Sequence, residues 1–208
     1  MDVIKEYCLL KGRAAVDEKF VVIGLSRGAS HAIDFALQYP DMVAGLVICA
    51  GWFGGFDFPN TTQEIAMFGR YDDFIGKGDA QNAAIMSVRI WGQGTQGDDG
   101  RLSKMVGDKI FEWCRMISQR EIDGTGGSAI PAQDLTPTAA KRLSDINVPT
   151  VVARGRYDET STNEAMRYAA QRIPGAKLKE FDTAHMINLE SPSEFNIWLD
   201  AYLDQFLR

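Results

Sequence analysis

The sequence is poor in the residues that metal sites, disulfide frameworks and membrane spans require. Its 208 residues include three cysteines, widely spaced and without a CxxC pair, and two histidines. The odd cysteine count favours reduced thiols in a cytoplasmic protein, and two histidines leave little scope for zinc. No apolar run approaches the roughly 20 residues of a membrane span. Residues 1–6 also lack the basic start and apolar stretch of a signal peptide. We expect a cytoplasmic protein without metal, cofactor or membrane contact.

The charge balance argues against nucleic acid as a partner. The formal net charge is −6, so the chain offers no electrostatic attraction to a polyanion or to an anionic membrane surface. Apolar residues make up 45% of the chain and charged residues 24%, which is typical of a folded domain rather than a disordered segment. A chain of this length can bury a sizeable core.

Short apolar runs alternate with helical patterns along the chain. Strands of the fully buried type are expected at residues 20–23, 43–50, 148–153 and 178–181. A helical pattern at 3–10 precedes the first strand, and capping boxes are expected to open helices at 161–164 and 191–194, the second with Pro192 at the first helical position. This alternation predicts an α/β fold, with a mostly parallel sheet and helices on both faces.

The stretch 52–138 interrupts that alternation. It is rich in glycine and aromatic residues, and helical patterns are expected at 63–74, 79–90 and 102–120. We interpret it as a helical lid inserted over the sheet. The predicted organisation is therefore a partial core at 1–51, the lid at 52–138 and the remaining core at 139–208.

A glycine-flanked serine follows the first predicted strand. Gly24-Leu25-Ser26-Arg27-Gly28 is a GxSxG motif between a strand and a helix, where a sharp turn lifts the serine off the sheet. Side chains at either glycine are expected to crowd the close approach of strand and helix. Ser26 is therefore the candidate nucleophile. The backbone N–H of Arg27, at the start of the helix, is the candidate oxyanion-hole donor.

A serine nucleophile needs a base and an acid that orients the base. Asp158 follows the predicted strand 148–153 and His185 follows 178–181, so both lie at the carboxyl ends of parallel strands, which share one edge of the sheet. Asp182 and Glu159 remain alternatives for the acid. The other histidine, His31, lies within the helix after the serine, and we expect it to be a packing or surface residue.

The lid is expected to form a mostly apolar substrate pocket. The candidate substrate contacts are Trp52, Phe53, Trp91 and Met186. Arg89 has two interpretations, a partner for a substrate carboxylate or a solvated surface residue.

At these residues the sequence resembles the α/β-hydrolase superfamily. The resemblance runs from the GxSxG motif to the C-terminus and includes the lid, the Gly155 to Asp158 loop, and His185 followed by residues 188–192. Within the superfamily the chain is similar to serine esterases and 3-oxoadipate enol-lactonase-like proteins. This resemblance implies hydrolysis of small carboxylic esters or lactones through an acyl-enzyme. C–C bond hydrolysis, acyl transfer or cofactor-free perhydrolysis on the same triad stay open, as does a non-catalytic binding protein or inactive fragment.

One departure from the superfamily concerns the residues before Ser26. Members have several strands there, and the loop after the third supplies a second oxyanion-hole N–H. The 25 residues before Ser26 suffice for one helix and one strand, so we expect an N-terminally incomplete fold without a second donor. The strand at 20–23 would then have an unpaired edge, which predicts self-association into a homo-oligomer.

Overall fold

Four parallel strands form one sheet in the part of the chain that the structure describes. The computed structural model describes residues 19–97, 100–125 and 135–206, so the helical pattern at 3–10 lies outside it. The sheet order is β1 (Phe20–Leu25), β2 (Val43–Cys49), β3 (Thr150–Gly155) and β4 (Lys177–Phe181), and every neighbouring pair is parallel. The prediction of an α/β fold with a mostly parallel sheet is confirmed.

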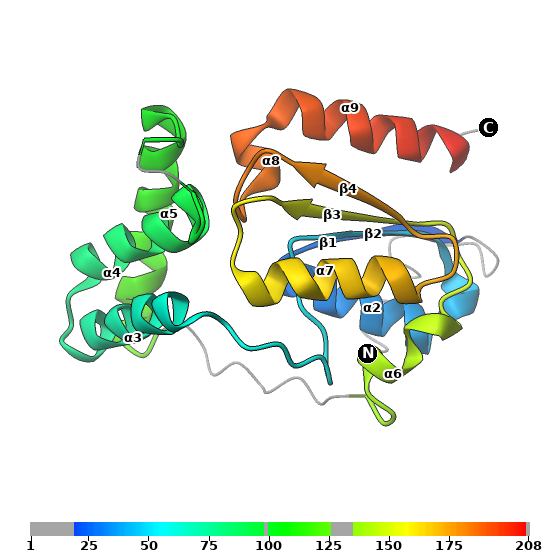
Figure 1. Cartoon of the computed structure of the whole chain (residues 1–208), viewed down its shortest axis with the longest axis horizontal. Helices are drawn as coiled ribbons and strands as arrows, with labels where there is room; N and C mark the ends of the chain where they lie inside the picture. Colours follow the sequence, from blue (N-terminus) through cyan, green and yellow to red (C-terminus); the bar gives the residue numbers. More distant parts are fainter. Residues whose placement is uncertain (1–18, 98–99, 126–134, 207–208) are drawn as a thin grey trace.

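Helices cover both faces of this sheet (Figure 1). One face is covered by α2 (Arg27–Gln38), α6 (Ala139–Arg142) and α7 (Thr160–Arg172), and the other by α8 (Ile187–Glu190) and α9 (Pro192–Leu203). Successive residues of β2 point to opposite faces: Leu46 and Ile48 pack on the α2 and α7 side, and Val47 and Cys49 on the α9 side. Because both faces are covered, β2 is apolar along its whole length. Short 3₁₀ turns lie at η1 (Pro40–Met42), η3 (Leu143–Asp145) and η4 (Asp204–Phe206).

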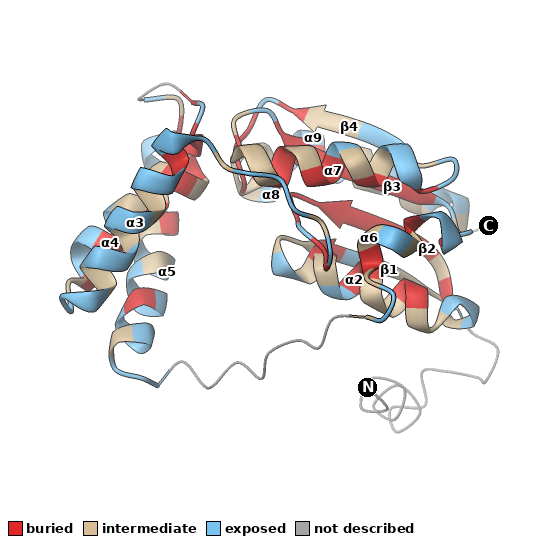
Figure 2. Ribbon diagram, turned by 60° about the horizontal axis from the view of Figure 1, so that its bottom comes forward, coloured by how far each residue is buried: buried red, intermediate tan, exposed pale blue. Residues whose placement is uncertain are grey.

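The two outer strands are more exposed than the two central ones (Figure 2). All six residues of β3 are buried, whereas Ile23 of β1 is 48% exposed and Leu178 of β4 is 43% exposed. The expectation that residues 20–23 and 178–181 form fully buried strands is therefore wrong. Within the described residues β1 pairs with a strand on one side only. Apolar side chains of β1 are therefore partly exposed to solvent at this edge of the sheet.

The chain between β2 and β3 forms a helical insertion. It contains α3 (Thr62–Gly76), α4 (Ala80–Ser87), a π-helical segment η2 (Val88–Gly94) and α5 (Lys104–Ile122). These helices stand together beside the edge toward which the strands point (Figure 1). The helices expected at 63–74 and 102–120 are present, while the one expected at 79–90 is α-helical only to Ser87 and continues as η2. Among the described residues, no helix is long and apolar enough to span a membrane.

The predicted capping boxes do not form. At α7 the N-cap is Glu159 and no side chain caps the helix, and Glu164 pairs with Arg167 instead. At α9 the N-cap Ser191 likewise makes no capping bond to the backbone, although the helix does begin at Pro192 as expected. A capping box occurs where none was expected, at the start of α3, between Thr61 and Glu64.

Candidate active site

Ser26 occupies a strained turn between β1 and α2. Its backbone has φ 56° and ψ −125°, a positive-φ conformation that is rare for a residue other than glycine. Neighbouring backbone holds the turn: the Ser26 N–H donates to Cys49 O at 2.9 Å, and the Ala29 N–H donates to Ser26 O at 2.9 Å. The turn is thus fixed by the end of β2 on one side and by the first turn of α2 on the other.

Two glycines, Gly24 and Gly51, leave the space that this turn requires. The sequence predicted Gly24 and Gly28 for this role, so only Gly24 is common to both pairs. A Cβ at Gly24 would lie 2.1 Å from Gly28 O, so strand and helix approach too closely for a side chain there. A Cβ at Gly28 would meet nothing within 4 Å, and the expectation for that glycine is wrong. The second required glycine is Gly51, whose Cβ would lie 2.3 Å from Ala29 Cβ and 2.9 Å from Ser26 O. Gly51 was not among the residues predicted for this site, and its place directly after a predicted strand was the available signal.

The structure brings Ser26, His185 and Asp158 together in one hydrogen-bonded row. His185 Nε2 lies 2.8 Å from Ser26 Oγ, and His185 Nδ1 lies 2.9 Å from Asp158 Oδ2. Asp158 is fully buried, and its second carboxylate oxygen accepts the Glu159 N–H at 2.8 Å. The geometry favours Asp158 over its rivals: Asp182 is an exposed partner of Arg156, and the Glu159 carboxylate accepts the Thr162 hydroxyl.

The loops that carry the acid and the histidine are packed against each other. A Cβ at Gly155 would lie 1.9 Å from Ala184 O, so only glycine fits where the Asp158 loop passes the His185 loop. The Asn163 side-chain amide donates to Asp158 O at 3.0 Å and fixes the acid loop from α7. Both loops are therefore held by contacts outside the row formed by Ser26, His185 and Asp158.

A buried ion pair supports the histidine loop from the insertion. The Glu190 carboxylate accepts the Ala184 N–H at 3.0 and 3.1 Å and pairs with Arg101 Nη1 at 2.6 Å. Arg101 also donates to Gly92 O at 2.6 Å and to Gln93 O, and its guanidinium lies 4.8 Å from the centre of the Tyr157 ring. Arg101 and Glu190 had no predicted role, because nothing local in the sequence of either segment indicates the other.

The electrostatic surroundings of His185 favour its protonated form. Burial lowers the pKa of His185, but the Asp158 carboxylate, its hydrogen bond, and the charges of Glu159 and Glu190 outweigh burial and raise the pKa above its ordinary value. A base that takes a proton during a reaction gains from this arrangement, because the imidazolium it becomes is stabilised by a neighbouring carboxylate.

Ser26 and His185 open onto a cavity of about 970 Å³ between the sheet edge and the insertion. Three of the four predicted substrate contacts line it, namely Trp52, Trp91 and Met186. Arg27 lines it too; as the first residue of α2 it has a backbone N–H without an acceptor inside the helix, as an oxyanion donor requires. Among the described residues, no group of His, Cys, Asp and Glu side chains could hold a metal ion.

The prediction that Phe53 contacts the substrate is wrong. Its side chain is fully buried in the core on the α7 side, with ring centres 5.3 Å from Phe56 and 6.3 Å from Tyr168. Trp52, next to it, is 46% exposed and lines the cavity. One aromatic of this adjacent pair therefore faces the cavity and the other enters the core.

The sequence left two interpretations open for each of two further residues, Arg89 and His31. Arg89 is half-buried, donates to Gly94 O at 2.5 Å within the insertion, and does not line the cavity, which places it away from any substrate carboxylate held at Ser26. His31 is exposed on α2, as expected for a surface residue, and lies on the wall of the cavity.

Known proteins share this sequence pattern over most of the chain. The family model of the α/β-hydrolase fold matches residues 13–192. Pyrrolizixenacetamide deacetylase of Xenorhabdus hominickii is 24% identical over 189 residues, covering 88% of this chain and 65% of that protein. Proline iminopeptidase of Saccharolobus solfataricus is 25% identical over 204 residues, covering 91% and 63%. The chain thus spans slightly less than two thirds of the length of these relatives.

Solved structures share the fold. Est816, described as an N-acyl homoserine lactone degrading enzyme, superposes with a TM-score of 0.62 at 26% identity, covering 97% of this chain and 72% of that one. A thermophilic esterase from Thermogutta terrifontis gives a TM-score of 0.66 at 20% identity, covering 97% and 70%. With the parallel sheet, the strained serine turn and the family match over residues 13–192, the chain belongs to the α/β-hydrolase fold family.

Proposed function

We propose that this chain is the catalytic part of a serine hydrolase that cleaves small carboxylic esters or lactones through an acyl-enzyme on Ser26. The observation that carries the proposal is the row of hydrogen-bonding distances, 2.8 Å from Ser26 Oγ to His185 Nε2 and 2.9 Å from His185 Nδ1 to Asp158 Oδ2, at the wall of a large cavity. The likeness to Est816, described as a lactone-degrading enzyme, supports the lactone class.

In the first half of the reaction, Ser26 Oγ attacks the ester carbonyl carbon while His185 Nε2 takes the hydroxyl proton. The Asp158 carboxylate stabilises the imidazolium that forms. The carbonyl oxygen becomes an oxyanion and accepts the Arg27 backbone N–H at the start of α2, where the helix dipole also favours negative charge.

In the second half, the imidazolium of His185 gives its proton to the departing alkoxide, and an alcohol leaves. The acyl group is now an ester of Ser26. A water molecule gives a proton to the neutral His185 and attacks this ester, and collapse of the second tetrahedral species returns the proton to Ser26 and releases the acid. With a lactone, the alcohol and the acid are two ends of one product.

The cavity suits a substrate with an apolar body. Trp52, Trp91 and Met186 line the part of the cavity shared with Ser26 and His185, and contact with their apolar surfaces would hold an acyl or alkyl group. Tyr71 and Glu121, joined by a hydrogen bond of 3.1 Å, form a polar portion of the wall within the insertion. Small esters that combine an alkyl group with a polar group are therefore the substrates to test first.

The proposal is tested with p-nitrophenyl acetate and butyrate, together with labelling by a fluorophosphonate that attacks activated serines. The chain and its Ser193→Ala control, which alters an exposed serine of α9, are expected to hydrolyse the esters and to take up one label. Ser26→Ala is expected to do neither. Labelling reports the nucleophile even if turnover is slow. Equal labelling of Ser26→Ala, or no labelling of the folded chain, contradicts the proposal.

A further inference from the structure

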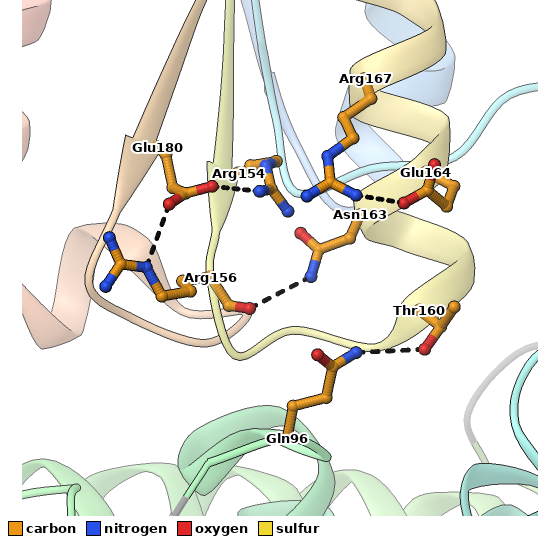
Figure 3. Close-up of a pocket in the computed structure, with 8 residues that line it drawn as sticks. All are labelled: Gln96, Arg154, Arg156, Thr160, Asn163, Glu164, Arg167 and Glu180. Carbon is orange, nitrogen blue, oxygen red and sulfur yellow. Dashed lines mark hydrogen bonds and ion pairs between the residues drawn. The ribbon is translucent and has the colours of Figure 1, made fainter.

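A second cavity, of about 430 Å³, lies between the first turns of α7 and the ends of β3 and β4 (Figure 3). None of the residues that line it lines the catalytic cavity. Its wall is polar throughout and consists of Gln96, Arg154, Arg156, Thr160, Asn163, Glu164, Arg167 and Glu180. A pocket of this size and polarity is unlike the apolar spaces left by imperfect packing, and it is large enough for a small ligand.

Positive charge is in excess in this cavity. Three guanidinium groups face two carboxylates, and one carboxylate, Glu180, is shared between Arg154 and Arg156. The other, Glu164, pairs with Arg167. Burial, and then electrostatic repulsion by Arg167, lower the pKa of Arg154. The two guanidinium groups therefore repel each other, and no carboxylate pairs with both of them. An anion between them would relieve that repulsion.

Two buried polar atoms of the wall have no partner. Arg154 is 6% exposed and its Nε–H has no acceptor, and Asn163 is 4% exposed and its Oδ1 has no donor. The Asn163 amide nitrogen is already committed to Asp158 O and Arg156 O, which fixes the orientation of the amide. An unpaired buried polar group costs folding free energy and is rare in proteins. A ligand or a water molecule can supply the missing hydrogen bond. Figure 3 shows the side chains of Arg154, Arg167 and Asn163 close to one another.

We propose that this cavity is a binding site for a phosphate group, held by the guanidinium groups of Arg154 and Arg167 with Asn163 as a third contact. Guanidinium groups match the oxygens of phosphate in geometry and charge. The two unpartnered atoms narrow the choice of anion, because one needs an acceptor and the other needs a donor. Hydrogenphosphate has both, whereas sulfate has the same tetrahedral shape and no hydrogen to donate.

Titration calorimetry at pH 7 and constant ionic strength tests this site with inorganic phosphate and sulfate as probes. Phosphate is expected to bind at one site per chain and at least about fivefold more tightly than sulfate, since one hydrogen bond separates them. Arg167→Gln is expected to weaken phosphate binding about tenfold or more, through loss of a charged contact. The matched control, Arg172→Gln, removes the same charge from the same helix outside the cavity and is expected to bind phosphate as the parent does.

Several outcomes would overturn the proposal: no phosphate binding at millimolar concentration, equal affinity for sulfate, or equal weakening by the two arginine variants. Arg167 is the residue to change because its side chain is 45% exposed, so the variant is expected to fold, whereas Arg154 is buried. Glycerol 3-phosphate as a third probe identifies the source of the phosphate group. Tighter binding than inorganic phosphate indicates an organic phosphomonoester, and weaker binding indicates free phosphate; both support the site.

Discussion

Glu64 is a buried carboxylate whose removal should loosen the insertion from the core. It is 2% exposed, and five hydrogen bonds reach it from three segments. One oxygen accepts the Thr61 N–H at 2.8 Å and the Thr61 hydroxyl at 2.9 Å. The other accepts the Thr95 hydroxyl at 2.7 Å, the Thr160 N–H at 2.8 Å and the Thr160 hydroxyl at 3.1 Å. Thr160 begins α7, two residues after Asp158, so Glu64 links α3 to the segment that carries the acid.

The variant Glu64→Gln keeps the size of this side chain and removes one acceptor oxygen. Whichever way the amide is placed, its NH₂ group faces a backbone N–H, either that of Thr61 or that of Thr160, and that N–H loses its acceptor. The hydroxyls can rotate, but the backbone N–H cannot. An unpaired buried donor costs about 1–3 kcal/mol, and hydrogen bonds to a charged acceptor are stronger than average. We expect the free energy of unfolding to fall by about 2–4 kcal/mol.

Urea unfolding followed by tryptophan fluorescence measures this loss, with Glu112→Gln on the exposed face of α5 as the control. The pH dependence provides a second check. Burial raises the pKa of Glu64, but the hydrogen bonds from Thr95, Thr61 and Thr160 outweigh it and lower the pKa below its ordinary value. A lowered pKa gives stability that is present above the unfolded-state pKa and is lost as pH falls through the folded one. The gap between parent and variant should therefore close below about pH 4. A loss no greater than that of Glu112→Gln would refute the reasoning.

Three other predictions follow from the site. The rate constant kcat/KM for p-nitrophenyl butyrate should rise with pH to a plateau with its midpoint above about 6.5, because the neutral form of His185 is the base and its pKa is raised; a midpoint lower than this contradicts that reasoning. Gly24→Ala should lower the thermal unfolding temperature strongly, because its Cβ would clash with the backbone of Gly28, whereas Gly28→Ala should leave that temperature equal or slightly higher. Similar effects of the two variants would argue against the close approach of β1 and α2 at Gly24. Phe53→Ala should lower the free energy of unfolding by about 3–5 kcal/mol, whereas Trp52→Ala should lower it much less and should raise KM for the butyrate ester. A larger loss of stability for Trp52→Ala than for Phe53→Ala would show that the roles of the two aromatics are exchanged.

The strands and the proximity of Ser26, His185 and Asp158 could be predicted because their signals are local. β1, β2 and β3 contain short apolar runs, whereas β4 (KLKEF) mixes charged and apolar residues, and Ser26, Asp158 and His185 each follow a strand within a few residues. Parallel pairing then brings the three loops to one edge without further information, since the carboxyl ends of parallel strands coincide. The distances between Ser26, His185 and Asp158 agree with that expectation.

The remaining features depend on contacts between distant segments. The pattern at 161–164 matches a capping box with Ser161 as the N-cap, yet the N-cap is Glu159 and α7 begins two residues earlier than that pattern predicts. The Thr160 N–H at this earlier start finds its acceptor in Glu64 of α3. A local motif cannot reveal an acceptor that lies about 100 residues away. Likewise, Trp52 and Phe53 are adjacent aromatics of similar hydrophobicity, and only the path of the chain after β2 decides which one enters the core.

The contacts of Arg101 join the insertion to the histidine loop, and we expect the two to open as one cooperative unit. If Arg101 and the residues at 92–97 moved away, Glu190 would remain as a buried carboxylate without its cation, and the Ala184 N–H that it holds would lose a fixed acceptor. Breaking a buried ion pair from one side is strongly unfavourable, so partial opening of either segment alone is disfavoured. In native-state hydrogen exchange, amides of the insertion around Gly92 and those of the loop before His185 should therefore become accessible together, with one shared opening free energy.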